Sequence, residues 1–201
     1  MRIQNLMIAA LLGLLVFSSS AISQTQLQFT MTGTGSGSQA GTAFSSKGFT
    51  VTGVFTPYAG SGTSTGALPV TYAKVVVNGV GTFELADSLK PYIFATPDTL
   101  GFGIGMIDLY NAQGILTGTG YTLEEPLGTL TGDGGWLLQW ADGVATSGGV
   151  LDFTDENGIT ATVKVEKYTP PPATPVPALP LFGLGILVSL LGLFGLRKLR
   201  Q

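Results

Sequence analysis

Apolar and polar residues alternate along much of the middle of the chain. The alternation is clearest at 159–166 and appears again at 27–31. This pattern is typical of a β-strand with one buried side and one side facing solvent. Similar short runs rich in β-favouring residues predict further strands at 49–55, 72–77, 81–85, 92–94, 100–109, 116–123, 135–140 and 149–153.

Turn signals separate these runs at regular intervals. Asn-Gly or Asp-Gly pairs occur at 78–79, 133–134, 142–143 and 157–158, and such pairs tolerate the positive φ angles of tight hairpins. Two Gly/Ser/Thr-rich stretches, 32–41 and 59–66, have little to bury and are predicted to be loops. No sustained 3.6-residue period is present. The pattern therefore predicts a mainly β body, an antiparallel β-sandwich or a barrel-like relative of it, over residues 24–168.

The first 23 residues have the three parts of a secretory signal peptide. A positive start with Arg2 precedes an apolar run at 6–17. Ala21 and Ser23 then place small residues at the −3 and −1 positions before Gln24. We expect cleavage near Ser23 and export of the body. An uncleaved anchor helix is the alternative, but the apolar run is short for a membrane span.

The C-terminal end combines a linker, an apolar run and a basic tip. Prolines crowd residues 169–177, which favours an extended linker. Residues 178–196 are free of charge and long enough for a helix to cross a bilayer. The basic tip consists of Arg197, Lys198 and Arg200. Basic residues favour the cytoplasmic side, so we expect a transmembrane anchor at 178–201 and an extracytoplasmic body.

The amino-acid composition excludes several classes of function for this protein. The 201 residues include no histidine and no cysteine, which excludes disulfides, a Ser-His-Asp triad and the usual zinc ligands. Between residues 24 and 168, five lysines oppose twelve acids, giving a formal charge of −7. Such a body is a poor nucleic-acid binder. We expect no cofactor, no metal and no enzymatic activity.

Two groups of residues allow a more specific interpretation. The acidic pairs at 124–125 and 155–156 suggest a carboxylate hydrolase, but neighbouring strand residues point to opposite faces, so turns are the simpler interpretation. Trp136 and Trp140 fall on one face of the strand predicted at 135–140. We expect them to be core residues, and the alternative is an exposed stacking surface for glycans.

The C-terminal segment resembles the sorting domains of the PEP-CTERM class, which exosortases process. In that class a short proline-containing motif precedes one transmembrane helix and an arginine-rich end. The residues at the motif position here are Val176, Pro177, Ala178, Leu179 and Pro180. The sequence departs from the namesake because it has no Pro-Glu-Pro, and it is closer to variants that begin with Val-Pro. The resemblance implies a Gram-negative host, often one that makes exopolysaccharide, and an exosortase-type partner.

Together these features predict an exported, non-enzymatic surface or extracellular-matrix protein. It would pass through an inner-membrane-anchored intermediate with a periplasmic body before reaching the cell surface or matrix. Two alternatives remain. One is a module that binds carbohydrate such as exopolysaccharide, and the other is a permanently anchored single-pass surface protein.

Overall fold

The computed structural model describes residues 25–57, 67–154 and 157–172. The chain divides into two compact units, Met1–Tyr168 and Thr169–Gln201, and the β-structure described here belongs to the first. Its strands are β1 (Leu27–Gln39), β2 (Thr42–Phe55), β3 (Leu68–Val77), β4 (Gly81–Glu84), β5 (Pro91–Ala95), β6 (Leu100–Ile104), β7 (Ile107–Ala112), β8 (Leu127–Trp136), β9 (Val144–Thr146), β10 (Gly149–Phe153) and β11 (Asn157–Lys167). Two short 3₁₀ helices, η1 (Asp87–Leu89) and η2 (Trp140–Asp142), complete the described elements.

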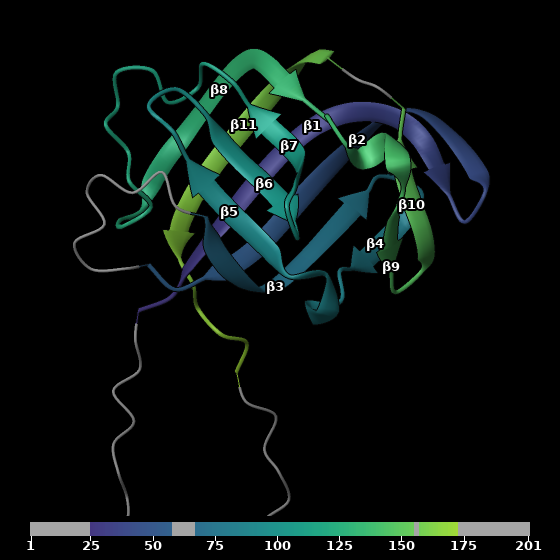
Figure 1. Cartoon of the computed structure of the whole chain (residues 1–201), viewed down its shortest axis with the longest axis horizontal. Helices are drawn as coiled ribbons and strands as arrows, with labels where there is room; N and C mark the ends of the chain where they lie inside the picture. The colour runs from purple at the N-terminus through teal and green to yellow at the C-terminus, as the bar shows by residue number, and fades with distance from the viewer. Residues whose placement is uncertain (1–24, 58–66, 155–156, 173–201) are drawn as a thin grey trace, which may run out of the picture. The chain divides into compact units, whose positions relative to one another are not determined.

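Eight strands close into an antiparallel barrel in the order β1-β2-β3-β5-β6-β7-β8-β11, with β11 returning to β1. Leu27 pairs with Lys167 and Thr32 with Thr162 in the closing ladder, and Figure 1 shows the first and last strands side by side. The prediction of a mainly β, antiparallel fold is confirmed. The architecture is a barrel rather than a sandwich, because the β1–β11 ladder joins the two ends of the sheet.

The longest strands extend beyond the barrel into a smaller group of strands. β1 exchanges its partner β11 for β10 at Gly37, while β3 exchanges β5 for β4. β9 pairs with β10, and a single bridge joins Thr146 of β9 to Leu85, the residue that follows β4. The edges of these extra strands are thereby partly covered, which limits exposed backbone pairing groups.

The core is made by the inward side of the alternating strands. It is rich in aromatic residues that contact one another, with ring centroids 5.4 Å apart for Phe29 and Phe102 and 5.2 Å for Trp140 and Phe153. Phe49 contacts both Tyr110 and Phe153. This arrangement buries enough apolar surface to stabilise a domain that has no disulfides.

Several predicted boundaries are wrong. Residues 32–39, expected in a loop, continue β1 because their backbone pairs with β2. The lack of a side chain at Gly33 and Gly35 leaves room for the rings of Phe49 and Phe153. The range 100–109 is a hairpin of β6 and β7 that turns at Gly105. Residues 116–123, expected in a strand, form a turn followed by irregular chain, although Leu116 and Leu123 are buried. The turn expected at 133–134 lies inside β8, while 59–66 falls outside the described residues.

Candidate functional site

The barrel has a short ladder where β3 meets β5. These strands share only the pairs Leu68–Ile93 and Pro69–Tyr92, whereas β3 pairs with β2 from Val70 to Val77. Beyond Pro69, β3 turns to pair with β4, and η1 leads the chain back to β5. The outer face beside β5 is therefore left open.

An open groove lies along this face, which we call the β5 groove. Its cavity volume is about 1010 Å³. The lining residues come from β3, η1, β5 and the β6–β7 hairpin: Ala67, Pro69, Val70, Thr71, Asp87, Lys90, Pro91, Tyr92, Phe94, Thr96, Gly105, Met106 and Asp108. At its rim, the side chain of Met106 is 98% exposed. The groove therefore combines aromatic and apolar surface with a few polar groups, which is the usual make-up of a small-molecule or polymer site.

Two aromatic rings of β5 rest on glycines of β6. Tyr92 pairs with Gly103 and Phe94 with Gly101, so paired residues share the outer face. A Cβ on Gly103 would meet the Tyr92 ring at 2.4 Å, and one on Gly101 would meet the Phe94 ring at 2.1 Å. The glycines are needed for this close approach. The two rings are neighbours, with centroids 6.1 Å apart and planes inclined by 36°.

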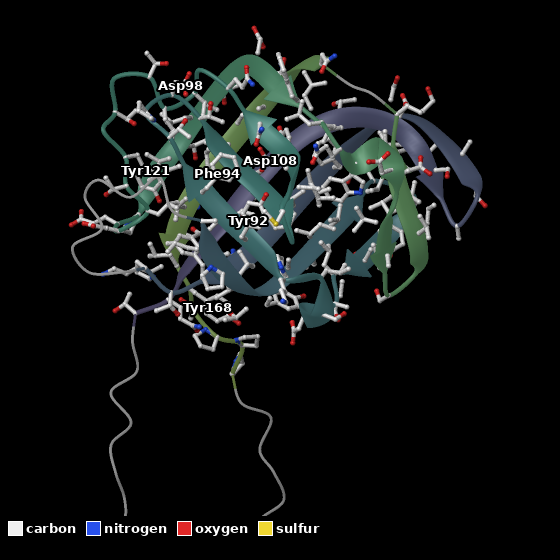
Figure 2. All side chains as sticks on the ribbon, in the orientation of Figure 1. Tyr92, Phe94, Asp98, Asp108, Tyr121 and Tyr168 are labelled. Atoms are coloured by element: carbon white, nitrogen blue, oxygen red, sulfur yellow. The ribbon has the colours of Figure 1, made fainter. Side chains whose placement is uncertain are left out.

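Asp108 fixes the position of the Tyr92 ring. The Tyr92 hydroxyl donates a 2.7 Å hydrogen bond to Asp108 Oδ1. Gln139 supports Asp108, because its side-chain oxygen accepts from the Asp108 N–H at 3.1 Å and its own N–H donates to the Asp108 carbonyl at 3.2 Å. Figure 2 shows Tyr92, Phe94 and Asp108 gathered over the outer face of β5, β6 and β7. Gln139 thus fixes the backbone of Asp108 from a separate part of the chain, while the Tyr92 hydroxyl binds the carboxylate.

The same contacts set the protonation state of Tyr92. Partial burial raises the pKa of its hydroxyl, and the hydrogen bond and negative charge of Asp108 raise it further. The hydroxyl is therefore a neutral donor at physiological pH, and it donates to Asp108. The Tyr92 hydroxyl therefore orients the ring as a hydrogen-bond donor and is not a phenolate near neutral pH.

A row of paired residues continues from the groove across the outer face. Phe94 pairs with Gly101, Gly101 with Asn111, and Asn111 with Trp136. Neighbouring strands are about 4.8 Å apart, so the row covers roughly 14 Å from β5 to β8. Asn111 donates to Asp108 Oδ2 at 3.4 Å, while its own side-chain oxygen is buried and accepts no hydrogen bond. The row ends at Trp136, whose side chain is 36% exposed.

The two tryptophans differ in burial: Trp140 lies in the core, and Trp136 lies on the surface. The strand predicted at 135–140 ends at Trp136, and Trp140 begins η2. Trp140 is fully buried, and its indole N–H donates to the Leu151 carbonyl at 3.2 Å. Trp140 is therefore a core residue, as expected, and the glycan-stacking alternative is wrong for it because its ring lies in the core at the start of η2. Trp136 remains accessible on the surface.

Most of the other predicted functional residues fall outside the described residues. These are Ala21 and Ser23 at the signal-peptide end, the motif residues Val176, Pro177, Ala178, Leu179 and Pro180, and the basic residues Arg197, Lys198 and Arg200. In the part of the chain that is described, no helix has the length and hydropathy of a membrane span. That same part contains no cluster of three or more His, Cys, Asp or Glu side chains suited to a metal ion.

Comparison with known proteins identifies no relative: no family model, no curated protein and no solved structure matches the chain. The interpretation of the site therefore depends on its own geometry.

Sequence reasoning missed the β5 groove. The sequence pattern predicts a strand at 92–94 but does not single out Tyr92, Phe94 or Asp108. A usable signal was present, since Tyr92-Ile93-Phe94 places two aromatic residues on one face and Gly101-Phe102-Gly103 places two glycines on one face. Their pairing across the sheet depends on the register of β5 and β6, which the sequence pattern alone does not give.

Proposed function

We propose that this protein is an exported, non-catalytic surface or extracellular-matrix protein of a Gram-negative bacterium. An exosortase-type enzyme processes its PEP-CTERM-like C-terminal segment after the body has crossed the inner membrane. The residues that the enzyme recognises include the motif at 176–180. The barrel is then the part of the protein that acts at the surface or in the matrix.

The observation that supports this proposal best is that the barrel is complete before the linker begins. β11 ends at Lys167, and the Tyr168 N–H donates to the Gln26 carbonyl at 2.9 Å. Residues 169–172 belong to no strand. Cleavage beyond residue 172 would therefore remove no strand of the barrel, and the folded body would survive the loss of its C-terminal segment.

Sorting can be tested in the native host with an antibody raised against the barrel. We expect a shorter form at the cell surface or in the matrix, and a longer membrane-bound form when the exosortase gene is deleted. A Pro177→Ala/Pro180→Ala variant should accumulate as the longer form, while Pro171→Ala in the linker should be processed normally. Identical mass and location with and without the exosortase would refute processing, and retention in the membrane in both strains would favour a permanent anchor.

A further inference from the structure

We propose that the β5 groove binds a strand of uncharged polysaccharide, with Tyr92 and Phe94 as the stacking platform. This inference rests on the proposed function, because a matrix location is what would bring the barrel into contact with polysaccharide. The rings, the polar groups beside them and the charge of the groove each favour such a ligand.

The rings provide the apolar part of such a site. One side of each sugar ring carries mainly C–H groups, which pack against aromatic surfaces, and aromatic side chains offer a large rigid contact area. Tyr92 and Phe94 are partly exposed on the outer face of β5 and lie over the backbone of Gly101 and Gly103. Because this backbone and Asp108 support the rings, they require little ordering when a ligand binds, which reduces the entropic cost of binding.

Polar side chains next to the rings suit hydroxyl groups. Asp87 and Asp108 can accept hydrogen bonds, Lys90 can donate, and the Thr71 and Thr96 hydroxyls can do both.

The negative charge of the groove favours an uncharged polysaccharide over an anionic one. Two acids and one lysine line the groove, and the whole body from 24 to 168 carries a formal charge of −7. A polyuronate would approach a negative surface and place carboxylates near Asp87 and Asp108, where like charges repel. An uncharged chain avoids this repulsion and still uses the carboxylates as hydrogen-bond acceptors.

The test is direct binding by the full-length chain purified in detergent micelles. The probes are cellohexaose, laminarihexaose and maltohexaose as uncharged oligomers, and an alginate hexamer as the anionic counterpart, all measured by isothermal titration calorimetry. We expect at least one uncharged oligomer to bind, and the alginate oligomer to bind at least about tenfold more weakly, because of the repulsion in the groove.

Variants locate the site. Phe94→Ala removes half of the platform and should weaken binding about tenfold, as loss of a central aromatic contact commonly does. Since this change uncovers Gly101, a second variant is needed that leaves the sheet untouched. Met106→Ala meets this need because its side chain is 98% exposed, and it should weaken binding about threefold through lost rim contact.

Tyr72→Ala is the matched control. Tyr72 is 39% exposed and lies on β3 outside the groove, so binding should be unchanged. Binding to none of the uncharged oligomers, preferred binding of alginate, or equal binding by all variants would overturn the proposal. Self-association that Phe94→Ala abolishes, with no binding to the oligomers, would instead assign the groove to a second copy of the chain. These results are independent of the sorting experiment, so either proposal can fail while the other stands.

Discussion

At the residue scale, several glycines of this protein matter because they have no Cβ, which lets other parts of the chain approach closely. Gly37 lies where β1 changes partner from β11 to β10, and a Cβ there would lie 2.1 Å from the Asp152 carbonyl oxygen. Gly101 and Gly103 make room for aromatic rings on the outer face. Composition alone had suggested that the Gly-rich stretch at 32–41 was a loop. Gly33, Gly35 and Gly37 are instead places where strands or rings approach closely, whereas Gly41 lies in the turn between β1 and β2.

A pair of glycine substitutions tests this interpretation. Gly37→Ala should lower the free energy of unfolding by roughly 1–3 kcal/mol, because the added methyl group overlaps backbone that must move. Gly128→Ala on β8 is the control, since a methyl group added there would meet no other part of the chain within 4 Å, and its effect should stay within roughly 0.5 kcal/mol. Urea denaturation followed by tryptophan fluorescence measures both, and equal stabilities for the two variants would contradict the role assigned to Gly37.

Tyr110 should make the barrel sensitive to alkaline pH. It is fully buried, its hydroxyl donates to the Thr32 carbonyl at 2.7 Å, and burial raises its pKa. An unfolded tyrosine loses its proton near pH 10, whereas the folded one keeps it to higher pH. The stabilising contribution is therefore complete below about pH 10 and declines above it, by up to about 1.4 kcal/mol per pH unit.

The measurement compares urea midpoints of the wild type and Tyr110→Phe at pH 8 and pH 11. The variant should be about 1 kcal/mol less stable at pH 8, since one hydrogen bond is lost, and should lose less stability between the two pH values. A decline of equal size in both proteins would show that other groups cause the alkaline sensitivity.

At the element scale, apolar and polar residues alternate along β11, the strand that closes the barrel, and so face the core and the solvent in turn. Val163 points inward and is fully buried opposite Met31, while its neighbour Thr162 points outward, where its hydroxyl lies 3.1 Å from that of Thr131. The same alternation predicted the strand from sequence. The partner of that strand, and hence closure of the barrel, depends on contacts with a strand near the opposite end of the body.

Two nearly isosteric substitutions in β11 should differ sharply. Val163→Thr places a hydroxyl in the core at the closing ladder and should cost about 2 kcal/mol of unfolding free energy. Thr162→Val changes an outward position and should remain within roughly 0.5 kcal/mol of the wild type. Thermal unfolding followed by circular dichroism distinguishes them, and a larger loss for Thr162→Val would mean that the assignment of faces is reversed.

At the scale of the whole molecule, β1 and β11 join the two ends of the body. Because Leu27 lies opposite Lys167, the chain enters and leaves the barrel at the same end. The unit Met1–Tyr168 has its own core and closes its own sheet. Stability of the body is therefore expected to depend on closure of the barrel and little on the segment that follows residue 168.

A truncated chain tests this independence. A protein spanning residues 24–172 should unfold in a single cooperative transition, with a urea midpoint equal to that of the barrel in the full-length chain. The slope of the transition should also be unchanged, because the same surface is exposed on unfolding. A broad transition, or a midpoint lowered by the truncation, would show that the C-terminal segment contributes to the stability of the barrel.

The sequence by itself determined the class of fold and the expectations about targeting. Alternation of apolar and polar residues reports which side of a strand is buried, and this local signal sufficed for 49–55 and 159–166. The alternation pattern did not determine that the barrel closes, because pairing of β1 with β11 depends on contacts between residues far apart in the chain. The same limit applies to the tryptophans and the groove. Only the tertiary structure separated buried Trp140 from exposed Trp136 and brought Tyr92, Phe94 and Asp108 together. Side chains from separate strands meet only once the register is set.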